Sequence, residues 1–167
     1  MCNPLSAPES QPPLTLIAVG SDIGADVVAW RVAEHLGLDH QRCRSPITEL
    51  PGMLSGRSDV VILDALLAAP GDSDVAQLLD LDEARAATPA TASHGLSVID
   101  TLRLIAEFDY LPARVDLIGL PIYTSQTSVT APQIESLSAQ VHVLLARRHQ
   151  SSITPAPKDI ATVTNHK

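Results

Sequence analysis

Three side chains in this sequence have the chemistry to bind one divalent metal ion: the carboxylates of Asp22 and Asp64 and the imidazole of His94. Neutral imidazole is the form that binds metals, and two carboxylates with one imidazole make a ligand set that suits borderline divalent ions. The three residues are far apart in the sequence, so a metal site requires a fold that brings them together.

Asp64 follows the clearest strand pattern in the chain. Residues 59–66 read Asp-Val-Val-Ile-Leu-Asp-Ala-Leu, with glycine-containing turn segments on both sides. This aliphatic run predicts a strand that is buried on both faces, as in the centre of a parallel sheet. Asp64 comes directly after Leu63, where we expect the strand to end, and ligands of open α/β sheets bind at the carboxyl ends of strands. The alternative is that Asp64 caps a turn.

Asp22 lies in the loop of a strand, loop and helix unit. Residues 14–19 predict the first strand, and residues 25–36 predict a helix whose apolar positions recur every four residues from Val28. Gly37 supplies the helix stop. After this unit, a polar stretch at 39–44 is weakly strand-like, and 47–54 predicts a short helix interrupted at Pro51-Gly52.

His94 lies between a long loop, residues 82–93, and a predicted helix at 95–109. Its ring is therefore expected near the positive end of a helix dipole, which favours the neutral imidazole. The apolar face of this helix includes Val98, Ile105 and Phe108. A single histidine at a helix start is more often a capping or solvent-facing residue, which is the alternative for His94.

The remaining elements complete an α/β pattern. Residues 74–81 fit an edge strand, residues 115–120 predict a buried strand, and residues 131–148 predict a helix that opens with a capping-box spacing from Thr130. We expect a three-layer α/β fold, with a twisted, mostly parallel sheet, helices on both faces and the option of one antiparallel edge strand.

A single domain accounts for most of the chain. The 167 residues can bury a sizeable core without a disulfide or a structural metal. We expect a flexible N-terminus at 1–13, one domain at 14–149 and a disordered tail at 150–167, since the tail has no apolar periodicity.

Composition excludes several classes of function. The net charge is −8, and both lysines, Lys158 and Lys167, lie in the tail, so the basic surface that nucleic acid requires is missing. Neither the number nor the spacing of Cys2 and Cys43 suggests a disulfide framework. Because the chain also lacks a signal-peptide pattern and a membrane-spanning run, we expect a cytoplasmic protein without membrane insertion.

The order of these segments resembles one known family, the hydrogenase maturation proteases. The resemblance runs from about 14 to 148 and rests on the strand, glycine, acid and helix unit, on Val-Val-Ile-Leu-Asp64-Ala, on Ser-His94-Gly-Leu opening a helix, and on Val-Asp-Leu-Ile-Gly at 115–119. The family fold is a twisted sheet with helices on both faces.

The resemblance implies an endopeptidase that removes the C-terminal extension of a nickel-loaded [NiFe] hydrogenase large subunit. This subunit would be the partner, and the free protein would be a monomer. Three family residues contact metal, and here they fall on Asp22, Asp64 and His94. The family further implies that the metal is the nickel of the substrate, and that no tightly bound organic cofactor is present.

The first loop departs from the family pattern. The family has Gly-Asn after the first strand and then two adjacent acids followed by glycine, whereas this chain has Gly20-Ser-Asp22-Ile-Gly24. Asp26 is the rival candidate for the first acid, although an acid there also complements a helix dipole. The altered loop supports a second hypothesis, in which the same fold is a non-catalytic chaperone or complex subunit that binds the large subunit.

Two other enzyme classes fit less well. The segment Gly20–Ala25 lacks the glycine spacing of a dinucleotide-binding turn and has no P-loop lysine. No serine lies on a G-x-S-x-G elbow, so a serine hydrolase is not indicated.

Overall fold

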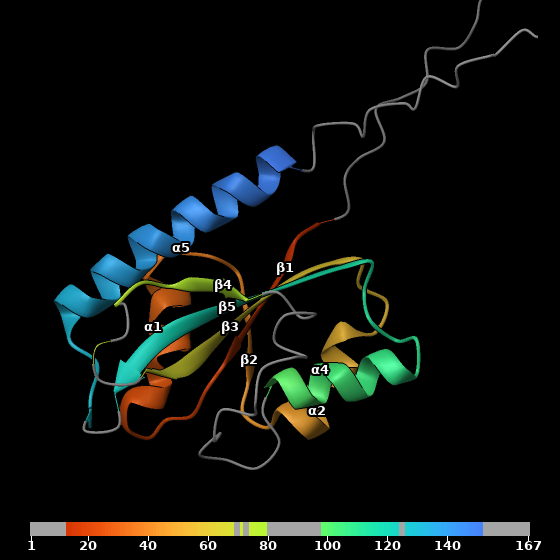
Figure 1. Cartoon of the computed structure of the whole chain (residues 1–167), viewed down its shortest axis with the longest axis horizontal. Helices are drawn as coiled ribbons and strands as arrows, with labels where there is room; N and C mark the ends of the chain where they lie inside the picture. Colours follow the sequence, from red (N-terminus) through yellow and green to blue (C-terminus); the bar gives the residue numbers. More distant parts are fainter. Residues whose placement is uncertain (1–12, 69–70, 72–73, 80–97, 124–125, 152–167) are drawn as a thin grey trace, which may run out of the picture.

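The structure is a computed structural model, and it describes residues 13–68, 71, 74–79, 98–123 and 126–151. One five-stranded sheet runs through it in the order β2-β1-β3-β5-β4 (Figure 1). The strands are β1 (Thr15–Val19), β2 (Gln41–Cys43), β3 (Asp59–Ala68), β4 (Gln77–Leu79) and β5 (Arg114–Tyr123). All neighbouring strands are parallel except β4 and β5, which are antiparallel. The predicted mostly parallel sheet with an antiparallel edge strand is confirmed.

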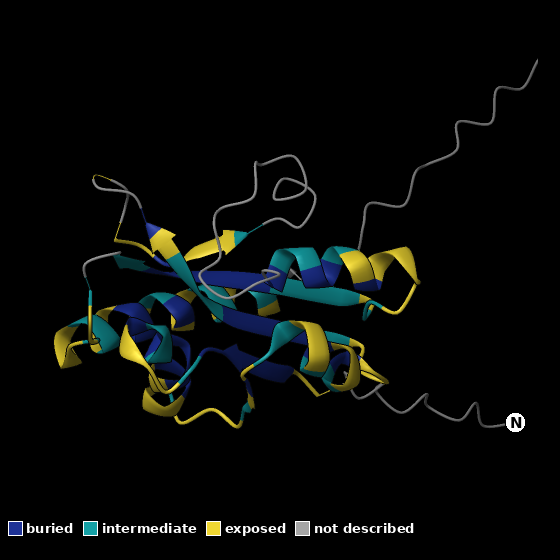
Figure 2. Cartoon of the chain, turned by 90° about the horizontal axis from the view of Figure 1, so that it is seen from below, coloured by how far each residue is buried: buried dark blue, intermediate teal, exposed yellow. Residues whose placement is uncertain are grey.

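Helices cover both faces of this sheet. They are α1 (Val28–His35), α2 (Pro46–Leu54), α4 (Val98–Glu107) and α5 (Ala131–Ser151), and a short 3-10 helix, η1 (Gly24–Val27), precedes α1. Helices α1 and α5 pack together on one face, and α2 and α4 pack on the other. In Figure 2 the strands are largely buried between helices whose outer faces are exposed. The three-layer α/β prediction is confirmed.

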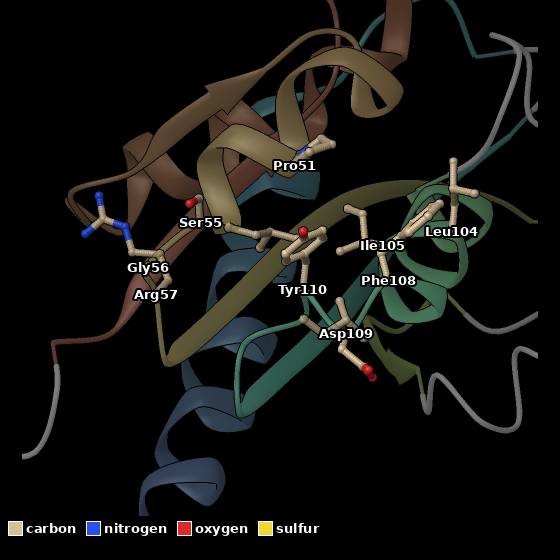
Figure 3. A pocket seen from close by; sticks show the side chains of 11 residues that line it. Pro51, Ser55, Gly56, Arg57, Leu104, Ile105, Phe108, Asp109 and Tyr110 are labelled. Carbon is tan, nitrogen blue, oxygen red and sulfur yellow. The ribbon is translucent and has the colours of Figure 1, made fainter.

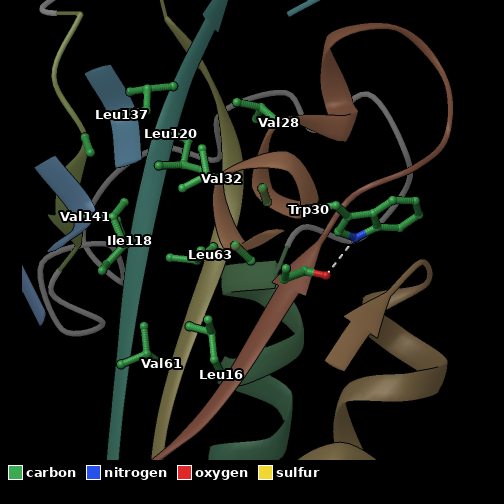
Figure 4. Close-up of a cluster of buried hydrophobic side chains, with 14 residues drawn as sticks. Leu16, Val28, Trp30, Val32, Val61, Leu63, Ile118, Leu120, Leu137 and Val141 are labelled. Carbon is green, nitrogen blue, oxygen red and sulfur yellow. Dashed lines mark hydrogen bonds between the residues drawn. The ribbon is translucent and has the colours of Figure 1, made fainter. Parts of the chain in front are cut away.

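Two hydrophobic clusters form the core, one on each face of the sheet. Alternate residues of a strand point to opposite faces, which divides β3 between the clusters. Val61 and Leu63 pack toward α1 and α5 (Figure 4), while Val60 and Ile62 pack toward α2 and α4. All four residues have no exposed surface, so β3 is a fully buried central strand.

The sequence correctly placed α1 and β2 but misjudged α2. Gly37 has a φ of +63°, so it ends α1 as expected. Helix α2 runs without interruption from Pro46 to Leu54 and contains Pro51. One proline costs a helix one backbone hydrogen bond, but α2 offsets that cost by burying Leu50 and Leu54 under the sheet.

Strand β3 is longer than its aliphatic run predicts. It continues past Asp64 to Ala68, because β5 pairs with it along ten consecutive residues. Its pairing with β1 ends at Leu63, opposite Ala18. The expectation that Asp64 ends the strand is therefore wrong. Asp64 is instead the first residue of β3 beyond its pairing with β1.

Helix α5 begins near its predicted start and runs to Ser151, beyond the predicted end. The backbone N–H of Gln133 donates to the hydroxyl of Thr130 at 3.4 Å, which is one half of the predicted capping box. The Gln133 side chain instead lies near Gln126 and the carbonyl of Pro121. It therefore ties the helix start to the end of β5. No helix among the described residues is both long and apolar enough to cross a bilayer.

The far end of α5 is held by ion pairs. The guanidinium of Arg148 donates to the carboxylates of Asp59 and Asp116 and to the carbonyl of Val60 at 3.2 Å. Only 10% of the Arg148 side chain is exposed. This buried cluster fastens the last turns of α5 to the amino ends of β3 and β5.

Candidate functional site

Asp64 lies at the carboxyl edge of β1 and continues the face of β3 that carries Ile62. Opposite it in β5 is Gly119. A Cβ atom at Gly119 would stand 3.1 Å from the side chain of Leu66, so a larger residue would disturb the strand beside Asp64. Glycine at this position lets the side chains of Leu66 and Leu79 pack over the strand beside Asp64.

The carboxyl group of Asp64 is electrostatically unusual. Burial, followed by the negative charge of Asp26, raises its pKa from the ordinary 3.8 to about 7, although a hydrogen bond from the backbone of Ala65 acts in the opposite direction. Asp64 therefore keeps its proton to a much higher pH than an ordinary aspartate does. A carboxyl with such a pKa at a strand edge is a candidate for proton transfer or for binding a cation.

Asp26 reaches this position because the chain folds back over Gly20. The backbone N–H of Gly20 donates to the carbonyl of Cys43 at 3.0 Å, which continues the β1 and β2 ladder by one residue. A Cβ atom at Gly20 would be 2.3 Å from the carbonyl oxygen of Asp26. Only glycine allows this approach, and Gly24, with a φ of +65°, turns the loop into η1.

Asp22 has different surroundings. It is exposed, and its carboxylate forms an ion pair with Arg44 at 2.7 Å. Asp26 is half-buried, and it is the neighbouring acid whose charge acts on Asp64. The structure thus brings Asp26 and Asp64 together and joins Asp22 to Arg44, while the choice of Asp22 as a site residue stays a prediction.

Trp30 lies against this loop beside Gly20, a position that no sequence pattern had predicted. Its indole N–H donates to the carbonyl of Ala18 at 2.9 Å (Figure 4). The guanidinium groups of Arg42 and Arg44 lie over its ring, 4.9 and 5.4 Å from the centroid. Two arginines at i and i+2 on a predicted strand share one face, and this spacing was the available signal.

Cys43 is the free cysteine of the described part of the chain, and it is fully buried near the site. Burial, and then the charge of Glu49, raises the pKa of its thiol to about 12. Asp64 adds to this effect. A thiol with this pKa is protonated at neutral pH, so Cys43 is not a nucleophile there.

His94 and the loop 82–93 lie outside the described residues, so the predicted meeting of Asp22, Asp64 and His94 stays a prediction. Among the residues that are described, no three His, Cys, Asp or Glu side chains are grouped so that they could hold a metal ion. Asp26 and Asp64 make a pair of acids, and a cation would relieve their repulsion.

Solved structures of other proteins share this architecture. The hydrogenase maturating endopeptidase HybD from E. coli superposes with a TM-score of 0.61 and 22% identity, covering 82% of this chain and 93% of that one. The fold is that of the hydrogenase maturation endopeptidases. The [NiFe] hydrogenase maturation protease HybD from Thermococcus kodakarensis has a TM-score of 0.56 and 18% identity, covering 81% of this chain and 97% of that one.

A third structure with the maturation-endopeptidase fold is an endopeptidase from Escherichia coli solved in solution, with a TM-score of 0.62 and 19% identity, covering 81% of this chain and 93% of that one. No protein-family model matches the sequence. No curated protein matches it either. The likeness to known proteins therefore lies in the fold.

Proposed function

We propose that this protein is an endopeptidase that removes the C-terminal extension of a nickel-loaded [NiFe] hydrogenase large subunit in the cytoplasm. The shared maturation-endopeptidase fold supports the class of reaction. The observation that carries the proposal is the carboxyl pair Asp26 and Asp64 at the carboxyl edge of the sheet, with the Asp64 pKa raised to about 7. In α/β sheets this edge is where ligands bind.

In the proposed site, Asp64, an acid from the first loop and His94 contact the nickel of the substrate. Asp26 is the better candidate for the first acid, because its charge acts on Asp64 while Asp22 is paired with Arg44. When nickel binds, Asp64 gives up the proton that it holds near neutral pH, and the cation takes the place of that proton.

Proximity supplies the rest of the chemistry. Side chains that hold the substrate nickel fix the scissile bond against it, where the metal polarises the carbonyl or activates a water. No nucleophilic serine or thiolate is needed, which is consistent with the protonated Cys43 thiol. The site is aspartic in type, since its acids position the substrate.

The test is a cleavage assay with purified large subunit that carries its extension. Wild-type protein should trim the nickel-loaded form and leave the nickel-free form intact. Asp64→Asn and His94→Ala should each lower trimming at least a hundredfold while the melting temperature shows a folded protein. Asp39→Asn, a change of an exposed acid on the loop after α1, is the matched control and should trim normally.

Two further variants separate the candidates for the first acid. Asp26→Asn should lower trimming as strongly as Asp64→Asn, whereas Asp22→Asn should lower it by less than tenfold. The reverse order would assign the role to Asp22. Normal trimming by Asp64→Asn would make Asp64 a structural residue and overturn the proposed site.

The second candidate function is a non-catalytic chaperone or complex subunit that binds the same large subunit. The altered loop Gly20–Gly24, with a single acid that is paired to Arg44, is the observation that favours it. Tight binding of the large subunit by wild-type protein, without any trimming of the nickel-loaded form, would decide for this alternative.

A further inference from the structure

An apolar pocket of about 570 Å³ lies at the opposite edge of the sheet from Asp64. It is formed by the C-terminal ends of α2 and α4 and the turns that follow them (Figure 3). Leu104, Phe108 and Tyr110 contribute to its wall, although they are 46%, 63% and 76% exposed. The helix pattern had assigned Phe108 to the buried face of α4, and the structure contradicts this.

This concentration of exposed aromatic rings is unusual for this chain. The sequence contains only four aromatic residues of the Phe, Trp and Tyr types, and two of them lie at this pocket. Exposed apolar patches with polar residues at the rim mark surfaces that another segment or molecule covers. Here the rim includes the charged residues Arg57 and Asp109.

The end of α4 holds the two rings in place. The N–H of Asp109 donates to Ala106 at 3.1 Å, and the N–H of Tyr110 donates to Ile105 at 3.3 Å. Asp109 has a φ of +57° and is the one described residue besides glycine in the left-handed region. These hydrogen bonds and the left-handed conformation of Asp109 fix the backbone between Phe108 and Tyr110. The part of the pocket wall that carries the two rings therefore has a defined backbone.

The last turn of α5 ends close to the same edge. Arg148 contacts Asp59 and Val60 at the start of β3, and its carbonyl accepts from the guanidinium of Arg114 at 3.4 Å. The backbone N–H of Arg114 donates to Ser58 at 3.0 Å. Ser58 follows Arg57, which lines the pocket, so these contacts connect the end of α5 to the same edge of the sheet, with α5 on the other face.

The sequence after Ser151 has the chemistry to fill this pocket. Its sixteen residues, 152–167, can extend over roughly 50 Å, and the four and six residues that lead from Ser151 to Pro155 and Pro157 over roughly 13 and 20 Å. They include Ile153-Thr154-Pro155-Ala156-Pro157 followed by Lys158 and Asp159. Proline-rich segments dock in aromatic-lined grooves because their extended conformation costs little entropy to fix.

We propose that the segment 152–167 docks in this pocket, with Pro155 and Pro157 against Phe108 and Tyr110. Lys158 and Asp159 then complement the rim charges of Asp109 and Arg57. Tethering through α5 makes the contact intramolecular, so that even a weak affinity suffices to populate it. The N-terminal segment 1–12 also contains prolines, but its only charged side chain is Glu9, which leaves the acidic part of the rim without a partner.

Paramagnetic relaxation in the full chain tests this docking. A nitroxide label is attached at Ala161→Cys in a Cys2→Ser background, where the remaining Cys43 is fully buried. The amide signals of Arg57, Phe108 and Tyr110 should broaden more than tenfold relative to the reduced label, and those near Asp39 should not. Uniform broadening, or none at the pocket, would overturn the proposal.

Matched variants identify the contact. Pro155→Ser with Pro157→Ser should remove the broadening, whereas Thr154→Ser should retain it. Phe108→Ala with Tyr110→Ala should also remove the broadening. The melting temperature should not change, because both rings are exposed. Val143→Ala, on an exposed position of α5, is the control and should retain the broadening.

Two other occupants give distinct results, and each would overturn the proposal. Broadening that appears when an unlabelled isotope-enriched chain is mixed with a spin-labelled chain would assign the pocket to a second copy. Pocket signals that shift on deletion of residues 1–12, but not on deletion of residues 152–167, would assign it to the N-terminal segment.

Discussion

Asp64 combines two properties that rarely occur together in a carboxyl group: it lies on a central strand and it titrates near neutrality. Burial alone disfavours the charged form, and the half-buried Asp26 beside it adds a second negative charge. In the fold the proton is therefore bound up to about pH 7, whereas in the unfolded chain it leaves near the ordinary value of 3.8. Folding stability must depend on pH over this interval.

The sign of this dependence follows from proton binding. Between about pH 4 and pH 7 the folded chain binds more protons at Asp64 than the unfolded chain, so the free energy of unfolding falls as pH rises. Asp64→Asn should therefore be more stable than wild type above about pH 7, by up to about 4 kcal/mol, since the pKa rises by about three units on folding and each unit is worth about 1.4 kcal/mol. Urea unfolding of both proteins across this range measures it.

Asp26→Asn is the control for the pH dependence. Without the second charge, the pKa of Asp64 in the fold should move down, so the fall in stability should end at a lower pH and be smaller in total. Equal pH profiles for wild type and Asp64→Asn would show that Asp64 keeps its ordinary pKa in the fold.

Gly20 offers a second test at this scale. Gly20→Ala would place a Cβ atom 2.3 Å from the carbonyl oxygen of Asp26, so the backbone of the loop must shift. We expect a loss of about 1–3 kcal/mol in unfolding free energy, the usual cost of overpacking. In Gly52→Ala, the matched control, the new methyl group has no atom within 4 Å and lies in α2, so stability should rise slightly.

The site could be predicted from the sequence only in part. Asp64 was found because it follows an aliphatic run, which is a local signal. Asp26 was ranked below Asp22 because an acid in the first turn of a helix already has a local explanation. The contact that sets Asp26 beside Asp64 depends on Gly20 and on the β1 and β2 ladder, which no local pattern contains.

Among the elements, β3 shows why strand ends are harder to predict than strand centres. Its first five residues follow the aliphatic run, but the continuation through Asp64 to Ala68 depends on pairing with β5. The sequence of β3 alone contains an acid at the point where a strand is expected to stop. Helix α2 was underestimated for a similar reason, since burial of Leu54 offsets the cost of Pro51.

The centre of β3 should tolerate no charge. Ile62→Asp places an unpaired carboxylate at a position with no exposed surface, between β1 and β5, and should cost several kcal/mol or prevent folding. Ile23→Asp is the comparison, because Ile23 is 81% exposed and its replacement should change stability by less than about 0.5 kcal/mol. Thermal melts of the two variants should differ clearly, and similar melting temperatures would contradict a buried β3.

The attachment of α5 to the sheet is a separate element-scale prediction. Arg148→Met removes the cation that pairs with Asp59 and Asp116. In this partly buried place Asp59 loses its contacts with Arg148, while Asp116 keeps its ion pair with Arg114. The expected loss is about 3–5 kcal/mol, because breaking a buried ion pair costs far more than breaking an exposed one.

Exposed Arg31→Met is the control for this change. Its ion pair with Glu34 lies on the surface of α1, so the loss should stay below about 1 kcal/mol. Adding Asp59→Asn to Arg148→Met should restore part of the stability, and denaturant unfolding of the single and double variants measures the coupling. Equal losses for Arg148→Met and Arg31→Met would mean that the cluster does not fasten α5.

At the scale of the whole molecule, the succession of strands and helices along the described chain was predicted almost completely, whereas the order of the strands within the sheet was not predicted. Periodicity identified the elements, and the right-handed crossovers of parallel strands leave few ways to arrange them. The pocket between α2 and α4 was not predicted, because Phe108 fits the apolar face of its helix in sequence and is exposed only because α4 ends with the tight turn at Asp109. The spacing of apolar residues indicates which face of a helix is apolar, but it does not indicate how much of that face other elements bury.

Metal binding by the free protein is a prediction at this same scale, since it requires segments from three parts of the chain. Added zinc, cadmium or nickel should raise the melting temperature of the wild type, because an ion that binds the folded state stabilises it by mass action. Asp64→Asn and His94→Ala should each abolish the rise, and a chelator should reverse it. A rise that persists in both variants would place the metal elsewhere.

The position of Trp30 gives the molecule a built-in optical probe. It is the single tryptophan of the sequence, is 1% exposed, and donates its indole N–H to Ala18 beneath the loop that leads to Asp26. Two guanidinium groups lie over its ring, and one of them also holds Asp22. All tryptophan fluorescence of this chain therefore comes from a ring that lies against Gly20 of the first loop. Its emission will report, without any label, on whatever moves the first loop, whether a metal ion, a change of pH or an arriving large subunit.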